Sequence, residues 1–161
     1  MHATPQTDPL HRMGSLATID RLLRTSLPAS LATLSQEIAT QLGLTITQLN
    51  CLNLLQRAAM PLSPVNLAEF TGLAPSTITK VVQQLERNGF LGTVKGERDL
   101  RRCYLVMTSR YDESLTSLLQ SMTIDIAIIG RLYHDHELKI VSNFLTDIIP
   151  VLDDETRRLR R

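Results

Sequence analysis

The side chains best suited to chemistry gather on one face of the segment from Pro75 to Gly89. In an α-helix each residue advances about 100° around the axis, so residues three and four apart share a face. Four polar or basic side chains then point the same way: Ser76, Lys80, Gln83 and Arg87. Three more flank them: Thr77, Thr79 and Gln84. Hydroxyl, amide and cationic groups bond to base edges and phosphates, and no acid interrupts the first two turns. The face indicates contact with nucleic acid; the alternative is an ordinary solvated helix surface.

The element that positions this face is predicted by the apolar residues behind it. They follow the i, i+3, i+4, i+7 spacing of an amphipathic helix: Ile78, Val81, Val82 and Leu85. Upstream, a short helix to Thr71 is predicted, with Ser63 as its N-cap and Pro64 at its first position. Gly72 occupies the turn between the two helices. A short helix, a glycine-containing turn and a second helix together predict a helix-turn-helix.

A basic hairpin follows the second helix. Residues 90–94 and 103–107 have the apolar and β-forming composition of two short strands. Four basic residues lie in the loop between them: Lys95, Arg98, Arg101 and Arg102. Asp99 precedes Arg101 by two residues, so its carboxylate can orient the guanidinium; the alternative for Asp99 is a turn-forming residue. A helix-turn-helix followed by such a hairpin predicts a winged helix, with the second helix in the major groove and a wing arginine in the minor groove.

The charge distribution supports a local contact with a polyanion. Residues 80–102 hold six basic and three acidic side chains, whereas the rest of the chain holds 11 basic and 13 acidic ones. Residues 80–102 therefore carry a net charge of +3 and the rest of the chain carries −2, although the net charge of the whole chain is only +1. The alternative is a winged-helix protein–protein interaction module without DNA binding, and such a module would have no use for a basic wing.

The residues before the helix-turn-helix are predicted to form two helices. Apolar spacing favours an amphipathic helix over residues 15–42. Pro28 predicts a kink or break in it near Ser26–Leu27. A second helix follows, capped by Thr45 or Thr47.

Two further helices are predicted after the hairpin. One long helix covers residues 109–133, and a loop follows at 134–136 with Asp135 as the next N-cap. The last helix runs from Glu137, and Pro150 kinks or ends it. The predicted fold class is mainly α with a small β-hairpin: a winged helix-turn-helix with N- and C-terminal dimerisation helices.

These last two helices carry more apolar surface than one small core needs. The residues concerned are Ile124, Ala127, Ile128, Val141, Phe144, Leu145 and Ile148. Because dimers bury such surface at two-fold interfaces, we expect a homodimer. The expected organisation is a mobile tail at 1–13, a helical dimerisation region at 14–44 and 109–161, and a winged-helix DNA-binding lobe at 45–108.

The helix-turn-helix and the wing together resemble the MarR family of bacterial transcription regulators. The likeness spans about residues 16–152 and is strongest at three runs: Leu67–Leu91, Asp99–Arg102 and Leu105–Thr108. The resemblance implies an obligate homodimer on one palindromic site, with the first, fifth and sixth helices interlocked and often a small-ligand pocket. We therefore expect a regulator of double-stranded DNA that responds to a small-molecule effector. The DNA-binding residues expected are Ser76, Thr77, Thr79, Lys80, Gln83, Arg87, Lys95, Arg98, Asp99, Arg101 and Arg102.

The other candidate sites have weaker support in the sequence. Cys51 and Cys103 cannot form a disulfide framework and fit a reducing cytosol. The run from His134 to Glu137 holds potential metal ligands, but ligands on one helix face would be four residues apart and this run is predicted as a loop. The sequence has no glycine-rich phosphate loop, nucleophile elbow or zinc motif, so we expect no enzyme activity, cofactor or metal. Without a membrane-length apolar run or a signal peptide, the protein is expected in the cytoplasm.

Overall fold

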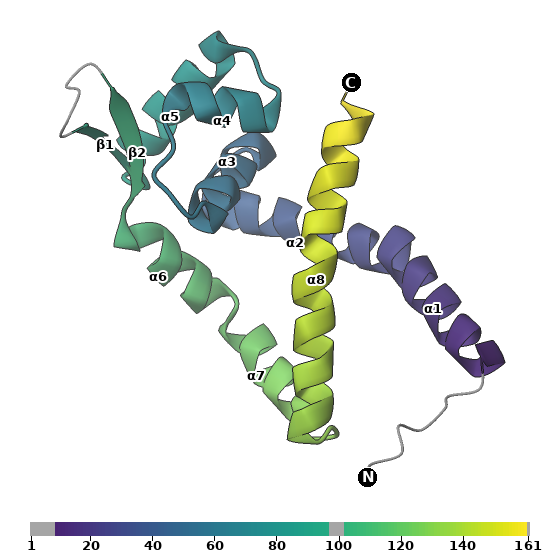
Figure 1. Ribbon diagram of the computed structural model, residues 1–161. Coiled ribbons are helices and arrows are strands. Elements are labelled where there is room, and N and C mark those ends of the chain that lie inside the picture. The colour runs from purple at the N-terminus through teal and green to yellow at the C-terminus, as the bar shows by residue number, and fades with distance from the viewer. Residues whose placement is uncertain (1–8, 97–101, 161) are drawn as a thin grey trace. The chain divides into compact units, whose positions relative to one another are not determined.

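The structure is a computed structural model that describes residues 9–96 and 102–160 (Figure 1). The chain divides into two compact units between Leu115 and Thr116. The first unit contains α1 (Pro9–Arg24), α2 (Ser26–Gln41), α3 (Ile46–Arg57), α4 (Pro64–Thr71), α5 (Pro75–Arg87), β1 (Leu91–Lys95), β2 (Cys103–Met107) and most of α6 (Ser109–Leu118). The second contains α7 (Gln120–Gly130) and α8 (Asp135–Leu159). A mainly helical chain with one two-stranded antiparallel sheet among the described residues confirms the expected mainly α class with a small hairpin.

Local sequence signals define the helix-turn-helix formed by α4 and α5. Ser63 caps α4, because its Oγ accepts a hydrogen bond from the Asn66 backbone N–H at 3.2 Å. The Asn66 side chain accepts in return from the Ser63 backbone N–H at 3.3 Å. Pro64 occupies the first turn, where a missing N–H costs no helical hydrogen bond. Gly72 ends the helix with a φ of +72°, a conformation that glycine adopts without steric cost.

The hairpin is attached to the helix-turn-helix through its backbone. β1 and β2 are antiparallel, with Thr93 opposite Leu105 at the centre. Leu105 also donates its N–H to the carbonyl oxygen of Leu62 at 2.8 Å, so the segment before α4 pairs with β2. We call residues 45–108, from the cap of α3 to the end of β2, the winged-helix lobe.

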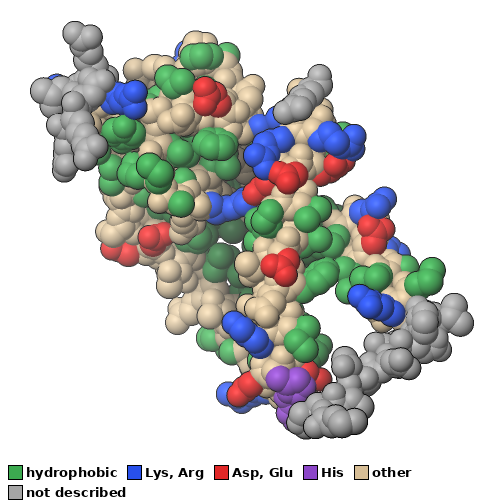
Figure 2. Space-filling view, in the orientation of Figure 1, with side chains coloured by type: hydrophobic (Ala, Val, Ile, Leu, Met, Phe, Trp, Pro, Cys, Tyr) green, Lys and Arg blue, Asp and Glu red, His purple; other side chains and the backbone are tan. Residues whose placement is uncertain are grey.

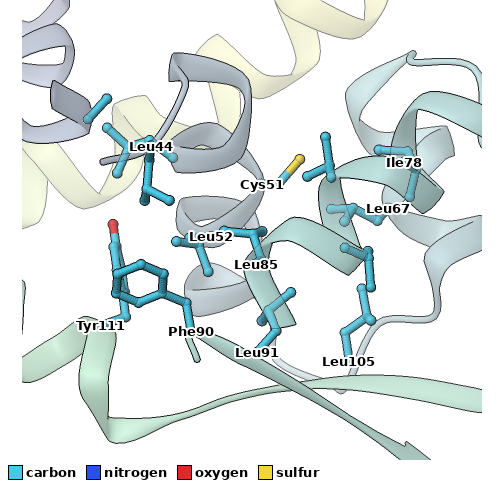
Figure 3. Packing of buried hydrophobic residues seen from close by; sticks show 14 of the residues in the cluster. Leu44, Cys51, Leu52, Leu67, Ile78, Leu85, Phe90, Leu91, Leu105 and Tyr111 are labelled. Atoms are coloured by element: carbon cyan, nitrogen blue, oxygen red, sulfur yellow. The ribbon is translucent and has the colours of Figure 1, made fainter. Parts of the chain in front are cut away.

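One apolar core holds the winged-helix lobe together (Figure 3). Its fully buried side chains come from α3, α4 and α5 and include Leu49, Leu52, Leu67, Ile78 and Leu85. Tyr111 of α6 closes the core with no exposed surface. Its ring meets Phe90 edge to face, with 6.3 Å between centroids. Its hydroxyl donates to Asn53 Oδ1 at 2.6 Å. The start of α6 is thereby fixed to the lobe.

The N-terminal segment corrects one prediction and refines another. α1 begins at Pro9, so residues 9–13, which we assigned to the mobile tail, are helical. The rest of that tail lies outside the described residues. The break predicted near Ser26–Leu27 lies at Thr25, which has φ −122° and ψ −75°. Pro28 accounts for it, since proline has no N–H to donate to the carbonyl four residues earlier.

The predicted single helix over residues 109–133 is wrong, because two helices occupy this segment. α6 ends at Leu118 and α7 begins at Gln120, while Leu119 between them has φ −100° and ψ 10°. The apolar spacing continues across the break, so periodicity alone does not reveal it.

The start of α8 also differs from the prediction. The helix begins at Asp135 rather than Glu137, and His134 rather than Asp135 is the N-cap residue. The His134 backbone N–H donates to the Glu137 carboxylate at 2.7 Å, which satisfies a group left free at a helix start. Pro150 does not end α8, which continues to Leu159. One proline removes one helical hydrogen bond, and the other bonds of this 25-residue helix remain.

The second unit consists of helices with no core of their own. Neither α7 nor α8 contains a buried residue among those described. Apolar side chains instead reach the surface along both helices, and Figure 2 shows them on α8. They include Ile124, Ile126, Ile128, Ile129, Ile140, Val141, Leu145, Ile149 and Leu152. Within the described part of the chain, no helix is both long enough and apolar enough to span a membrane.

Candidate nucleic-acid interface

α5 divides into an apolar inner face and a polar outer face, as predicted. Its four inward residues are buried: Ile78, Val81, Val82 and Leu85. Its outward residues are all exposed: Ser76, Thr77, Thr79, Lys80, Gln83, Gln84 and Arg87. Two of them bond to the helix's own backbone, Thr79 Oγ1 to the Pro75 carbonyl at 3.0 Å and Arg87 Nε to the Gln83 carbonyl at 3.3 Å. The structure therefore places all six predicted α5 residues on one accessible surface.

The N-terminus of α5 is suited to a negatively charged ligand. Its N-cap residue, Ala74, has no side chain that could accept from the first-turn amides. The first turn also lacks an acidic residue. Because first-turn amides and the helix dipole favour negative charge, this end can receive a phosphate beside Ser76 and Thr77.

The acidic residue of α5, Glu86, is directed away from the outer face. Its carboxylate accepts a hydrogen bond from the hydroxyl of Thr93 on β1. The bond joins α5 to the first strand of the hairpin. The outer face of α5 consequently keeps the positive character of Lys80 and Arg87.

The end of the hairpin is fastened to the end of α5. Thr108 donates its Oγ1 hydrogen to the Gly89 carbonyl at 2.7 Å and its N–H to the Phe90 carbonyl at 3.1 Å. The guanidinium of Arg110 lies 5.3 Å from the centroid of the Phe90 ring, within cation–π range. Gly89 itself has a φ of +74°. These contacts join the end of β2 to the residues that follow α5.

The described part of the wing carries two of its predicted basic residues. Lys95 ends β1 and Arg102 precedes β2, and both side chains are exposed. The backbones here are joined, since the Gly96 N–H donates to the Arg102 carbonyl at 2.8 Å. Three predicted residues lie outside the described ranges: Arg98, Asp99 and Arg101. The proposed Asp99–Arg101 pair stays a prediction.

Sequence reasoning missed one residue that bears on this surface. Gln48 of α3 is 5% exposed and donates from Nε2 to Oε1 of Gln84 on α5 at 2.7 Å. The sequence does hold a signal for it, because Thr45-x-x-Gln48 matches a capping box. A capping box predicts the bond within α3 but not the contact with α5.

The cysteines and histidines form no evident site in the described residues. Burial raises the pKa of Cys51 from 9.0 to about 11, so its thiol stays protonated at neutral pH. Cys103 is half-buried at the start of β2. His134 and His136 stack with 5.8 Å between ring centroids. No group of three or more metal-binding side chains is found in the part of the chain described.

Comparison with known proteins agrees with this geometry. The model of the MarR family matches residues 44–103, which is nearly the whole winged-helix lobe. YcgE of Bacillus subtilis (strain 168), an uncharacterised HTH-type transcriptional regulator, is 26% identical over 126 residues, covering 78% of this chain and 81% of its own.

Solved structures share the fold over most of the chain. A MarR family protein from Bacillus stearothermophilus superposes with a TM-score of 0.63 at 23% identity, over 87% of this chain and 96% of its own. A MepR mutant of S. aureus bound to an oligodeoxyribonucleotide gives 0.53 at 19% identity, over 83% and 97%. MarR family proteins are transcription regulators and not enzymes, in agreement with the expectation of no catalytic role. Residues 44–103 thus form a MarR family domain, and over most of its length the chain is similar to an HTH-type transcriptional regulator and shares the fold of MarR family structures.

Proposed function

We propose that the protein binds double-stranded DNA as a homodimer on a palindromic site, with one α5 in the major groove of each half-site. The observation that carries the proposal is the division of α5 into a buried apolar face and an exposed face of hydroxyl, amide and basic groups. An α-helix fits into the major groove of B-form DNA, where the edges of the four bases can be distinguished. The MepR complex with an oligodeoxyribonucleotide shows a protein of this fold on DNA, and this supports the proposal.

Each part of the surface has a distinct role in this proposal. Ser76, Thr77, Lys80 and Gln83 contact base edges, while the N-terminal end of α5, whose N-cap residue Ala74 offers no side-chain acceptor, lies against phosphate. Lys95 and Arg102 at the base of the wing add contacts to the neighbouring backbone. In the tip, Asp99 orients Arg101 toward the minor groove.

The dimer is supported by the exposed apolar surface of α7 and α8. In a single chain Ile124 and Ile128 are each 54% exposed and Leu145 is 48% exposed. Leaving such groups in water forgoes about 25 cal/mol for each Å² of apolar surface. Because α7 exposes apolar residues around much of its circumference, it requires cover on more than one side. A second copy of the chain supplies it.

The proposal includes a small-molecule effector, and the match of residues 44–103 to the MarR family model supports it. An effector controls DNA binding by favouring one arrangement of the two lobes in the dimer. The check is a screen for compounds that release the protein from its operator at fixed salt. A true effector lowers affinity for the operator and, by linkage, binds more weakly when operator is present.

The experiment that tests DNA binding is capture of genomic fragments by the purified full-length protein, followed by sequencing. We expect the retained fragments to share an inverted repeat, and a synthetic duplex of that repeat to bind at least about 10³-fold tighter than a shuffled duplex at physiological salt. If the protein retains no DNA, or all fragments equally, the proposal is wrong. The protein–protein interaction module would then be the better account of the fold.

A further inference from the structure

The buried carboxamide of Gln48 has both of its ends in use. Its Oε1 accepts the backbone N–H of Thr45 at 2.7 Å, and its own backbone N–H donates to Thr45 Oγ1 at 3.2 Å. At the other end, Nε2 donates to Oε1 of Gln84 at 2.7 Å. A chain of hydrogen bonds thus runs from the start of α3 to the outer face of α5.

The direction of this chain follows from chemistry as well as from coordinates. A backbone N–H can only donate, so the end of Gln48 that faces Thr45 must be oxygen. The opposite end is then the NH₂ group, which can only donate, so the end of Gln84 that faces Gln48 must also be oxygen. The usual ambiguity between oxygen and nitrogen in a carboxamide is removed at both residues.

This chain determines what Gln84 offers to a ligand. Gln84 is exposed on α5, four residues after Lys80 and beside the face that Lys80 shares with Ser76, Gln83 and Arg87. Because oxygen and nitrogen diverge from one carbon, turning Oε1 toward α3 leaves Nε2 as the outer end. An unrestrained glutamine can present both an acceptor and a donor to adenine, whereas this one presents N–H donors.

We infer that Gln48 is a positioning residue, which holds the Gln84 carboxamide so that α5 offers donors to acceptor atoms on a base edge. The inference rests on the proposed function, in which α5 enters the major groove. Guanine N7 and O6 and thymine O4 are such acceptors, while the amino group of cytosine is not. Gln84 then selects against cytosine at the base that it faces.

The variant Gln48→Glu is designed to reverse the orientation of the Gln84 carboxamide. Above the pKa of the introduced carboxyl, which burial raises, its carboxylate accepts the Thr45 N–H with one oxygen and can only accept with the other. Gln84 must then donate Nε2 inward, and its oxygen becomes the outer end. The matched charge control is Asn50→Asp, which adds one negative charge at an exposed position of the same helix.

The first readout is side-chain amide NMR of the full-length protein without DNA, labelled with ¹⁵N-glutamine. The Gln84 resonances are assigned by their disappearance in Gln84→Met. We expect the Gln84 NH₂ protons to exchange rapidly with water in the wild type and in Asn50→Asp, and to become protected in Gln48→Glu. Protected Gln84 protons in the wild type, or no change in Gln48→Glu above the pKa of the introduced carboxyl, would overturn the inference whatever the protein does with DNA.

The second readout is selection from a randomised operator library at fixed salt. We expect Gln48→Glu to change base preference at one position of each half-site by roughly tenfold, toward bases that present an amino group. Asn50→Asp should lower affinity uniformly, and Gln48→Glu should have no added effect on preference in the Gln84→Met background. An unchanged preference in Gln48→Glu, or a change that persists without Gln84, contradicts the inference.

A second variant covers the case in which Gln48→Glu does not fold. Gln84→Glu alters only an exposed residue and still accepts from Gln48, but it offers no donor outward. It should lose the preference for acceptor bases as fully as Gln84→Met does. Wild-type protein that selects no sequence would instead remove the proposed function, and the NMR result would still decide the orientation of Gln84.

Discussion

The winged-helix lobe and the C-terminal unit of α7 and α8 use apolar residues in different ways. α5 alone buries four apolar side chains in the core of the lobe, whereas α7 and α8 bury none. The lobe buries its apolar core within one chain. We expect the apolar side chains of the C-terminal helices to be buried against another chain. The stability of the lobe should therefore be independent of protein concentration, and that of α7 and α8 should depend on it.

The largest effect is expected in the core of the lobe. Leu85→Ala removes a side chain that is 0% exposed and leaves a cavity among α3, α4 and α5. The free energy of unfolding should fall by about 2–5 kcal/mol. Urea unfolding, followed at protein concentrations a hundredfold apart, should give the same loss at both. A loss that grows on dilution would show that the lobe depends on the dimer.

A smaller effect, confined to association, is expected on α8. Leu145→Glu places a charge on an apolar side chain that is 48% exposed in one chain. Buried at a dimer interface, this charge should weaken self-association by at least about tenfold. Sedimentation equilibrium measures the change.

The matched control is Asn143→Glu, which puts the same residue on the opposite side of α8. It should leave the dimer constant unchanged. Equal weakening by the two variants would assign the effect to net charge rather than to the apolar face.

A loss of about 1–2 kcal/mol is expected for Gly89→Ala, at the junction of α5 and β1. The residue has a φ of +74°, and an added Cβ would lie 3.3 Å from Nη1 of Arg110. Gly43→Ala is the control, because its φ is also positive, +65°, but nothing lies within 4 Å of its Cβ. Thermal unfolding should therefore rank Gly89→Ala below Gly43→Ala. The reverse order would mean that the Arg110 side chain moves away from the added Cβ without a loss of stability.

The smallest effect is a pH dependence of the lobe. Burial raises the pKa of Cys51 from 9.0 to about 11, and burial together with Asp112 raises the pKa of Tyr111. The folded lobe therefore holds these protons more tightly than the unfolded chain does. Its stability should be complete below pH 9 and fall as the pH rises toward 11. Cys51→Ala should make the decline in urea midpoint shallower, and an unaltered decline would show that Cys51 does not contribute.

The sequence predicts the lobe better than the helices that follow it in the chain, for physical reasons. Ser63, Pro64 and Gly72 start or end α4 through local backbone geometry. Their effects can therefore be predicted without knowledge of the rest of the fold. The break at Leu119 and the continuation of α8 through Pro150 are settled by a balance of packing and single hydrogen bonds, which apolar spacing does not encode.

The candidate site divides in the same way. The outer face of α5 follows from helical periodicity, which places Ser76 and Lys80 together without knowledge of any neighbour. The contact between Gln48 and Gln84 joins residues that are 36 positions apart, so no local sequence pattern predicts it. Local geometry therefore identifies the surface, and tertiary contacts decide the orientation of its side chains.

The most direct test of the central claim is the affinity of Lys80→Ala for the selected operator and for variants substituted at each position, at fixed salt. If α5 reads bases, the variant should lose about 1–3 kcal/mol of binding free energy on the operator and tolerate substitution at one position of each half-site. A loss that is equal for operator and unrelated DNA would contradict the account, because Lys80 would then contact only phosphate.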